Sequence, residues 1–276
     1  MTSDGYDRYY KYHYRIDRDN IKGTDNETKL DQNFESARRF GAGLGKTYSK
    51  FFGKGMTIDV GSSTGGVLYG LREAHPELRI FGIEPSESES EFARKKGVPT
   101  QTVLFEDYKG QFYGNVANVL CVQSLNHLLD PASFLKWSWN ALQDGGHIFL
   151  AVKNFRHQVR RAGSLEAGIQ IDHVYMFTPE TLLALVEAAG FEVAYMDVDE
   201  GKGAAQIAKQ KSEGFNIHHI RLIAHKAQTS SMQNDHLSGN YRSLRLAFWR
   251  PWLKIYYCFR YSSRLAFLRR VLHIGM

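Results

Sequence analysis

Predicted strands and helices alternate along the middle of the chain, and this alternation restricts the fold more than any other feature. Runs of buried-type residues predict strands at 56–60, 78–86, 100–105, 117–124, 147–152, 191–198 and 217–226. Helical spacing, with caps or prolines at several starts and glycine at several ends, predicts helices at 30–52, 65–76, 87–97, 130–146 and 178–190. Strands joined by helical crossovers lie parallel, so we expect a mostly parallel seven-stranded α/β sheet with helices on both faces. Ligands bind such sheets beyond the carboxyl ends of the strands, so functional residues should follow the strands.

The composition fits a folded chain in a reducing compartment. Of the 276 residues, 43% are hydrophobic, which is enough for a large buried core. The two cysteines, Cys121 and Cys258, form neither a disulfide framework nor a metal motif, and we expect Cys121 to be a buried core residue. The N-terminal sequence lacks the apolar core of a secretory signal, and no apolar run reaches the roughly 18 residues that span a bilayer. A cytoplasmic location is therefore expected.

Two glycine-rich stretches could hold a ligand, and the first, GAGLGKT at 41–47, fails as a phosphate-binding loop. That motif needs four residues between its first glycine and the Gly-Lys pair, whereas Gly41 and Gly45 enclose three. The motif also follows a buried strand, whereas the sequence before Gly41 has helical character. We therefore interpret this stretch as a bend or a packing contact.

The second stretch, IDVGSSTGG at 58–66, has the setting of a ligand site because it joins a predicted strand to a predicted helix. A dinucleotide-binding loop carries a glycine where the backbone approaches the diphosphate, and Ser63 occupies that position here. The loop suits a nucleoside without phosphate, and Asp59 favours a cation. Glu84 ends the next strand, where an acid accepts hydrogen bonds from two ribose hydroxyls.

These features, with others further along the chain, resemble a class I S-adenosylmethionine-dependent methyltransferase over residues 56 to about 225. The first loop resembles the family motif D-x-G-x-G-x-G, with Ser63 in place of the middle glycine, and GIEPS resembles the acidic motif after the second strand. The stretch 119–150 resembles the fourth-strand motif and the turn into strand five. The sequence DHVYMFTPETLLALVEAAGFEV resembles small-molecule and sugar methyltransferases. The resemblance implies a Rossmann-like fold.

The resemblance also implies S-adenosylmethionine as the cofactor and assigns its contacts. The loop after the first strand would hold the methionine part, Glu84 the ribose, residues 105–107 the adenine, and residues 123–124 the region near the sulfonium. The residues expected to bind the cofactor are Asp59, Gly61, Ser62, Ser63, Gly65, Glu84, Phe105, Glu106, Asp107, Gln123 and Ser124. For Glu106 and Asp107 a solvated loop is the alternative.

Methyl transfer is an in-line displacement that depends on alignment, and an oxygen or carbon acceptor that has to lose a proton also needs a base, commonly histidine. The candidates for base or substrate contact are His127, His173 and Tyr175. His157 is a further candidate, within an arginine-rich stretch, 156–161, that would bind an acidic substrate or form a solvated face. The alternative for His127 is a loop residue bonded to backbone. No metal is expected, because the histidines of 218–225 have no Cys or acid at ligand spacing.

The two ends extend beyond a methyltransferase domain at 56–226. In the N-terminal segment 1–55, Tyr9, Tyr10 and Tyr12 are expected to contribute to a helical lid, with surface packing as the alternative. Residues 227–276 form a linker and a basic, aromatic tail. Its last part, 243–276, has seven Lys and Arg residues and no acid, which favours an anionic membrane surface as a partner. A helix packed on a subunit or partner is an alternative, and nucleic acid is not expected.

The sequence therefore predicts an S-adenosylmethionine-dependent methyltransferase for a small-molecule or glycan acceptor, including a lipid-linked one. Two alternatives stay open. One is an NAD(P)-dependent oxidoreductase with the same sheet, and the other is a non-catalytic adaptor that keeps the cofactor fold at a membrane surface. The expected place is the cytoplasm, with peripheral association at the inner face of a membrane.

Overall fold

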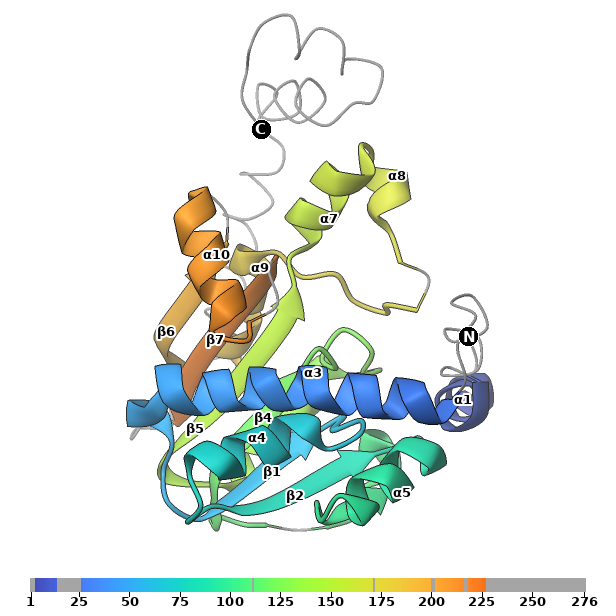
Figure 1. The fold of residues 1–276 in the computed structure, drawn as a ribbon, viewed down its shortest axis with the longest axis vertical. Helices are drawn as coiled ribbons and strands as arrows, with labels where there is room; N and C mark the ends of the chain where they lie inside the picture. The colour runs from blue at the N-terminus through green and yellow to red at the C-terminus, as the bar shows by residue number, and fades with distance from the viewer. Residues whose placement is uncertain are drawn as a thin grey trace, which may run out of the picture.

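A computed structural model of the chain describes residues 3–13, 26–110, 112–170, 172–199, 202–215 and 218–226. They form a seven-stranded sheet in the order β3-β2-β1-β4-β5-β7-β6, with helices on both faces (Figure 1). The strands are β1 Met56–Val60, β2 Arg79–Glu84, β3 Thr100–Thr102, β4 Val116–Val122, β5 Leu142–Lys153, β6 Phe191–Val198 and β7 His219–Lys226. The helices are α1 Ser3–Arg8, η1 Tyr9–His13, α3 Asn26–Thr47, η2 Ser49–Phe51, α4 Gly66–Ala74, α5 Glu87–Lys95, η3 Phe105–Asp107, α6 Pro131–Ala141, α7 Phe155–Ala162, α8 Leu165–Gly168, α9 Pro179–Ala188 and α10 Ala204–Ser212.

The predicted sheet is confirmed. Strands β1 to β5 pair in parallel, and β7 is antiparallel to both β5 and β6. The chain moves outward from β1 through β2 to β3, and then returns to place β4 on the other side of β1. A cleft forms at such a reversal because the crossovers on the two sides leave in opposite directions. The carboxyl ends of β1 and β4 are therefore where a ligand site is expected.

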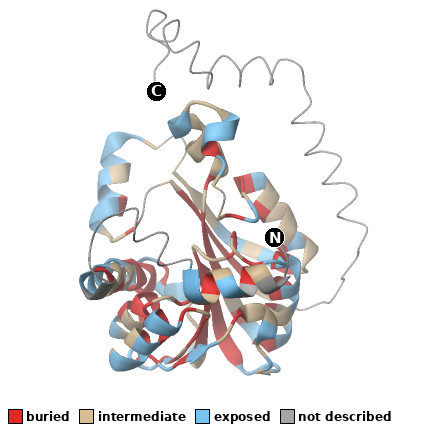
Figure 2. Cartoon of the chain, turned by 90° about the vertical axis from the view of Figure 1, so that its right-hand side faces the viewer, coloured by how far each residue is buried: buried red, intermediate tan, exposed pale blue. Residues whose placement is uncertain are grey.

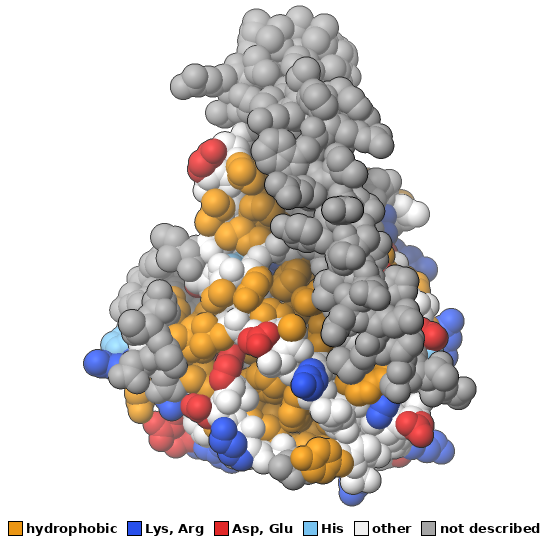
Figure 3. All heavy atoms as spheres, turned by 180° about the vertical axis from the view of Figure 1, so that it is seen from behind, with side chains coloured by type: hydrophobic (Ala, Val, Ile, Leu, Met, Phe, Trp, Pro, Cys, Tyr) orange, Lys and Arg blue, Asp and Glu red, His pale blue; other side chains and the backbone are white. Residues whose placement is uncertain are grey.

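The sheet is the centre of the core. All residues of β4, including Cys121, are buried, as expected for a strand that is covered on both faces. In Figure 2 the strands are mostly buried while the helices expose their outer sides. Seen from behind the view of Figure 1, hydrophobic side chains form a broad area interrupted by a few charged groups (Figure 3).

The helix starts that were predicted from caps are confirmed. The carboxylate of Asp130 accepts the backbone N–H groups of Ala132 and Ser133, each at 3.0 Å, and Pro131 occupies the first turn of α6. Strand β5, in contrast, begins at Leu142, earlier than the expected residue 147. Its first residues pair with β4 across a register irregularity, and Gly145 adopts the positive φ of 72° that this irregular stretch uses.

The stretch GAGLGKT lies inside the continuous helix α3, so it is not a phosphate loop and the predicted packing contact is confirmed. A Cβ on Gly41 would lie 2.0 Å from the carbonyl oxygen of Val67 in α4. Reciprocally, a Cβ on Gly70 of α4 would lie 1.9 Å from the carbonyl oxygen of Arg38 in α3. Glycines on both helices let the two backbones touch, and this contact holds α3 beside the loop that follows β1.

Three α-helices were not predicted: α7 and α8 between β5 and α9, and α10 between β6 and β7. Helices α7 and α8 stand beyond the carboxyl end of β5 in Figure 1. No helix in the described part of the chain is long and apolar enough to cross a membrane. The predicted tail, 227–276, lies outside the described residues.

Candidate active site

A cavity of about 710 Å³ opens at the carboxyl ends of the central strands. The carboxylates that line it on the β1–β3 side, which we call the acidic half, are Asp59, Glu84, Glu89 and Glu106. The side beyond β4 and β5, which we call the basic half, carries His127, Lys153, Arg161 and His173, together with the single carboxylate Asp172. Helix α3 and two tyrosines of the N-terminal segment complete the lining.

Asp59 at the end of β1 provides a buried negative group without a full set of partners. Its side chain is 1% exposed, and its Oδ1 atom accepts no hydrogen bond from the described residues. Burial raises the pKa of this carboxyl to about 7, and a backbone hydrogen bond from Val122 opposes the shift. A cationic ligand group would satisfy Oδ1, so this position fits the ammonium of the methionine part of S-adenosylmethionine.

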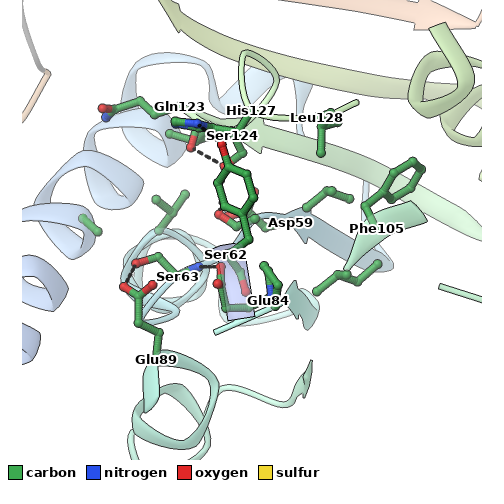
Figure 4. A pocket seen from close by; sticks show the side chains of 18 of the residues that line it. Asp59, Ser62, Ser63, Glu84, Glu89, Phe105, Gln123, Ser124, His127 and Leu128 are labelled. Carbon is green, nitrogen blue, oxygen red and sulfur yellow. Dashed lines mark hydrogen bonds between the residues drawn. The ribbon is translucent and has the colours of Figure 1, made fainter. Parts of the chain in front are cut away.

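The loop after β1 is shaped by backbone conformation and by two glutamates. Gly61 has φ +74°, and a Cβ there would lie 2.3 Å from Ser124 Oγ. Ser63, at the position where the resembling family has glycine, also has a positive φ of 50°. Its N–H donates to Glu84 Oε2 at 2.8 Å and its hydroxyl donates to Glu89 Oε1 at 2.5 Å (Figure 4). These charged hydrogen bonds offset the cost of a left-handed serine.

Glu84 is bonded to the loop and also lines the cavity. Its Oε1 atom accepts the backbone N–H of Ser86 at 2.9 Å, and its side chain lines the cavity. Because each carboxylate oxygen carries two lone pairs, a carboxylate can bond to backbone and to a ligand at the same time. The position therefore fits the two hydroxyls of a ribose, as the sequence predicted.

The adenine region is only partly as expected. Phe105 and Glu106 line the cavity, and Glu106 Oε1 accepts the N–H of Leu129 at 2.9 Å. Asp107 is exposed and outside the lining, because the short helix η3 turns it toward solvent. Ser62 lines the cavity, whereas Gly65 does not and instead begins α4 with a φ of +76°.

The loop after β4 joins the two halves. Gln123 and Ser124 both line the cavity, and the hydroxyl of Ser124 donates to the carbonyl oxygen of Gly61 at 3.0 Å. Gln123 has φ +60°, and its N–H donates to the Ala151 carbonyl of β5 at 2.6 Å. The loop is therefore fixed to β1 on one side and to β5 on the other.

His127 lies at the end of this loop, and its ring orientation is set by backbone. Its Nδ1 atom is 2.9 Å from the carbonyl oxygen of Asp172 and 3.0 Å from the hydroxyl of Tyr10. A carbonyl can only accept, so we assign the proton to Nδ1, which makes Nε2 the basic nitrogen. The hydroxyl of Tyr6 donates to the backbone oxygen of His127 at 2.7 Å.

The N-terminal segment therefore reaches the site, though not through all the expected residues. Tyr10 lines the cavity as predicted, but Tyr12 is 58% exposed and Tyr9 is not part of the lining. Tyr6, which was missed, lines the cavity and packs against Tyr10 with ring centroids 4.6 Å apart. The signal was available, because Tyr6 and Tyr10 are spaced to share one face of a helix.

His173 faces His127 inside the cavity, with ring centroids 4.8 Å apart. Its pKa is lowered to about 4, mainly by burial and further by His127 and by the charge of Lys153, so the ring is neutral near pH 7. Tyr175 was expected beside it but is outside the lining, and its hydroxyl donates to the Leu129 carbonyl at 3.1 Å. His157 is also outside the lining and stacks on His218.

Four lining residues of the basic half were not proposed individually as site residues: Lys153, Arg161, Gln170 and Asp172. Lys153 directly follows the predicted strand 147–152, so a signal for it was available. The other three belong to or follow the unpredicted helices α7 and α8, where no strand end marks them. Among the described residues, His127, Asp172 and His173 form one group with donor atoms within 4.8 Å of one another, the kind of spacing a metal could use. The bond from His127 Nδ1 to a backbone carbonyl suits either role of Nε2, as a base or as a metal ligand.

A Rossmann-like sheet with a carboxylate-lined cavity and a loop unsuited to diphosphate is the arrangement expected of a class I methyltransferase. The family described as "Methyltransferase domain" matches residues 32–195. The chain belongs to this family, and its cofactor is S-adenosylmethionine.

Individual proteins agree with this assignment. A ubiquinone biosynthesis O-methyltransferase of Aeromonas salmonicida is 28% identical over 179 residues, which cover 60% of this chain and 73% of that protein. An S-adenosylmethionine-dependent methyltransferase from Clostridium acetobutylicum has a similar structure, with a TM-score of 0.55, 10% identity, and coverage of 73% of this chain and 99% of the other. One from Archaeoglobus fulgidus has a TM-score of 0.54, 18% identity, and coverage of 73% and 100%. Both of these solved structures share the fold of this chain.

Proposed function

We propose that the protein transfers the methyl group of S-adenosylmethionine to a hydroxyl oxygen of a small-molecule or glycan acceptor bound in the basic half. The observation that carries this proposal is the hydrogen bond of His127 Nδ1 to the Asp172 carbonyl, which makes Nε2 the nitrogen that takes a proton. The similarity to a protein named as an O-methyltransferase supports an oxygen acceptor.

The bound cofactor supplies a methyl group already activated on a sulfonium, so the chain has to align the acceptor and remove its proton. His127 would accept that proton at Nε2, and a positioned base of this kind contributes about 10²- to 10⁴-fold to the rate. His173 is neutral near pH 7 because its pKa is about 4, so it would contact the acceptor as an uncharged hydrogen-bonding group. Tyr10 would position His127 through the contact at Nδ1.

The acidic half would hold the cofactor. Asp59 would bind its ammonium, and Glu84 would accept hydrogen bonds from its ribose. Phe105 and Glu106 would lie against the adenine, and residues 123–124 would lie near the sulfonium. Support for this assignment comes from the unsatisfied Oδ1 atom of Asp59 and from the location of these residues along one cavity.

Transfer of a radiolabelled methyl group tests the proposal. Acceptors should include catechol, 3,4-dihydroxybenzoate and nucleotide sugars. We expect the wild type to methylate an oxygen of one of them, and His127→Gln to lower turnover by about 100-fold or more while S-adenosylhomocysteine still binds. His157→Gln is the matched control, because that histidine lies outside the lining. Full activity in His127→Gln would contradict the role of His127 as the base.

For a lipid-linked acceptor, we propose that the tail 243–276 holds the protein at an anionic membrane surface. Support comes from the segment 165–174, some of whose residues line the basic half. Its apolar side chains Leu165, Ile169 and Val174 are at least half exposed, so they are free to contact a membrane surface. Sedimentation with anionic and neutral vesicles tests this, using the full chain and a chain that ends at residue 242. Equal pelleting of the two chains would remove the membrane role of the tail.

A further inference from the structure

Charge is distributed unevenly within the cavity. Among the described residues, the acidic half carries four carboxylates, Asp59, Glu84, Glu89 and Glu106, and no Lys or Arg side chain lines it. Lys153 and Arg161, the two Lys and Arg side chains that the described lining contains, are both in the basic half, where Asp172 is the one carboxylate. The cofactor accounts for the acidic half because its ammonium and sulfonium are cations. It does not account for Lys153 and Arg161.

Lys153, at the end of β5, is held in a defined position at the cavity wall. Its ammonium donates to Gln170 Oε1 at 3.0 Å, and Gln158 Nε2 donates to the same oxygen at 2.6 Å. Both donors use the carbonyl oxygen of Gln170, so its NH₂ group is the part of that amide able to donate into the cavity. Lys153 and Gln170 are both half-buried, which strengthens interactions with charge relative to bulk water.

Arg161 is on α7, the helix that follows β5, and its side chain reaches the same cavity. Another arginine of that helix, Arg156 in its first turn, pairs with Glu180 at 2.5 Å. No ion pair links Arg161 to another residue of the described chain. A guanidinium presents paired N–H donors that match the oxygens of carboxylate and phosphate.

The electrostatic environment agrees with this geometry. The pKa of His173 is lowered mainly by burial, then by His127 and by the charge of Lys153, while Asp172 opposes the shift. The pKa of His218 is lowered mainly by burial, and the charges of Arg161 and Arg160 on α7 add to the shift. Positive potential at one end of a cavity and negative potential at the other would orient a molecule that carries charge at one end.

We infer that the basic half contains a subsite for an oxyanion, a carboxylate or phosphate of the acceptor, formed by Lys153 and Arg161 with the amide of Gln170. This inference rests on the proposed function and narrows its substrate class to acceptors with an anionic group. The carboxylates of the acidic half repel that group, so the acceptor binds with its anionic end at Lys153 and Arg161. Its nucleophilic end is then directed toward His127 and the cofactor.

Two probes that differ in charge test the subsite: 3,4-dihydroxybenzoate and its neutral amide, 3,4-dihydroxybenzamide. Each is titrated calorimetrically into the full chain loaded with S-adenosylhomocysteine. We expect the benzoate to bind about 10- to 100-fold more tightly than the amide, as charged hydrogen bonds allow. Phenyl phosphate in place of the benzoate distinguishes a phosphate subsite from a carboxylate subsite.

Arg161→Gln should remove most of the preference for the anion, and Lys153→Met should do the same. Arg161 is exposed, so its replacement is the safer variant for folding, which the thermal midpoint monitors. Arg160→Gln is the matched control, because Arg160 is the adjacent arginine of α7 and does not line the cavity. The subsite would be overturned if the wild type bound the two probes with equal affinity, or if neither probe bound at millimolar concentration. It would also be overturned if Arg160→Gln reduced the preference for the anion as much as Arg161→Gln does.

The outcome is separable from the proposed function. Anion-selective binding without methyl transfer to any acceptor would leave the subsite standing and remove the methylation proposal for that acceptor class. Methyl transfer to neutral catechols, with no preference for anionic acceptors, would support the methylation proposal and remove the subsite. Affinity for S-adenosylhomocysteine, measured in each variant, should change by less than about threefold, because neither cation belongs to the acidic half.

Discussion

The two halves of the cavity are built in different ways. The acidic half consists of residues at the ends of neighbouring parallel strands or within the first residues after them, tied together by short hydrogen bonds such as that from Ser63 to Glu84. The basic half is assembled from segments distant in the chain: Tyr10 precedes the sheet, His127 follows β4, and Asp172 follows α8. The half assigned to an invariant cofactor is thus fixed by the sheet, whereas the half assigned to the acceptor depends on segments that can change without altering the sheet.

The halves also respond to pH in opposite directions. Asp59 has a folded-state pKa near 7, above its unfolded value, so its contribution to stability is present at low pH and is lost as the pH rises through 7. His173 has a folded-state pKa near 4, below its unfolded value, so its contribution is present above about pH 6.5 and is lost as the pH falls toward 4. Each half can therefore be perturbed separately.

The largest expected effect is on the cofactor. Glu84→Gln keeps the shape of the side chain but removes its charge, so two hydrogen bonds from the ribose become neutral. We expect affinity for S-adenosylhomocysteine to fall by about 100-fold in calorimetric titration. Glu87→Gln, an exposed change in the same region of the chain, is the control. If both variants bind like the wild type, the acidic half does not hold the ribose.

The second effect is the pH dependence of cofactor binding. Because Asp59 has to be charged to pair with an ammonium, affinity for S-adenosylhomocysteine should fall about tenfold for each pH unit below 7. Asp59→Asn should bind weakly with little dependence on pH between 5 and 7. A wild type with constant affinity over that range would show that Asp59 does not pair with the cofactor.

The third effect is on stability and belongs to the basic half. Between pH 7 and pH 5.5 the unfolded chain protonates His173 more readily than the folded chain does, which costs about 1 kcal/mol. Urea unfolding should show a loss that is larger by this amount in the wild type than in His173→Gln, because the pKa of His219 is also lowered to about 4 and this histidine titrates in both proteins. His225→Gln, which changes a more exposed histidine on β7, should behave like the wild type.

The smallest effect tests the link between the N-terminal segment and the base. Tyr10→Phe removes the hydroxyl beside His127 Nδ1, and we expect turnover to fall by about fivefold, in keeping with one hydrogen bond. The affinity for S-adenosylhomocysteine should stay the same. Tyr12→Phe, at an exposed position of η1, should leave both quantities unchanged. Equal losses in the two variants would point to a general effect on the segment.

The difference in construction also decides what could be predicted from the sequence. The positions of Asp59 and Glu84 followed from local patterns, because a strand that ends in a turn places its last side chain at the edge of the sheet. Asp107 could not be placed in the same way, since one turn of η3 decides whether it faces the cavity or solvent.

Residues of the basic half are brought together by tertiary contacts without local signals. Arg161 belongs to a stretch in which the helices α7 and α8 were not expected, whereas Lys153 ends a predicted strand. Tyr175 was expected in the site but bonds to the Leu129 carbonyl outside it. Tyr6 was missed although its helical spacing to Tyr10 was visible. The sequence alone does not say which turn of such a segment faces a cavity that other elements complete.

A crystal structure of the full chain with S-adenosylhomocysteine tests the central claim most directly. The account predicts that the adenosyl group lies in the acidic half, with its ribose hydroxyls bonded to Glu84 and its ammonium beside Asp59, and that its sulfur faces His127. Density for the adenosyl group among Lys153, Arg161 and Gln170 would contradict the division of the cavity into a cofactor side and an acceptor side.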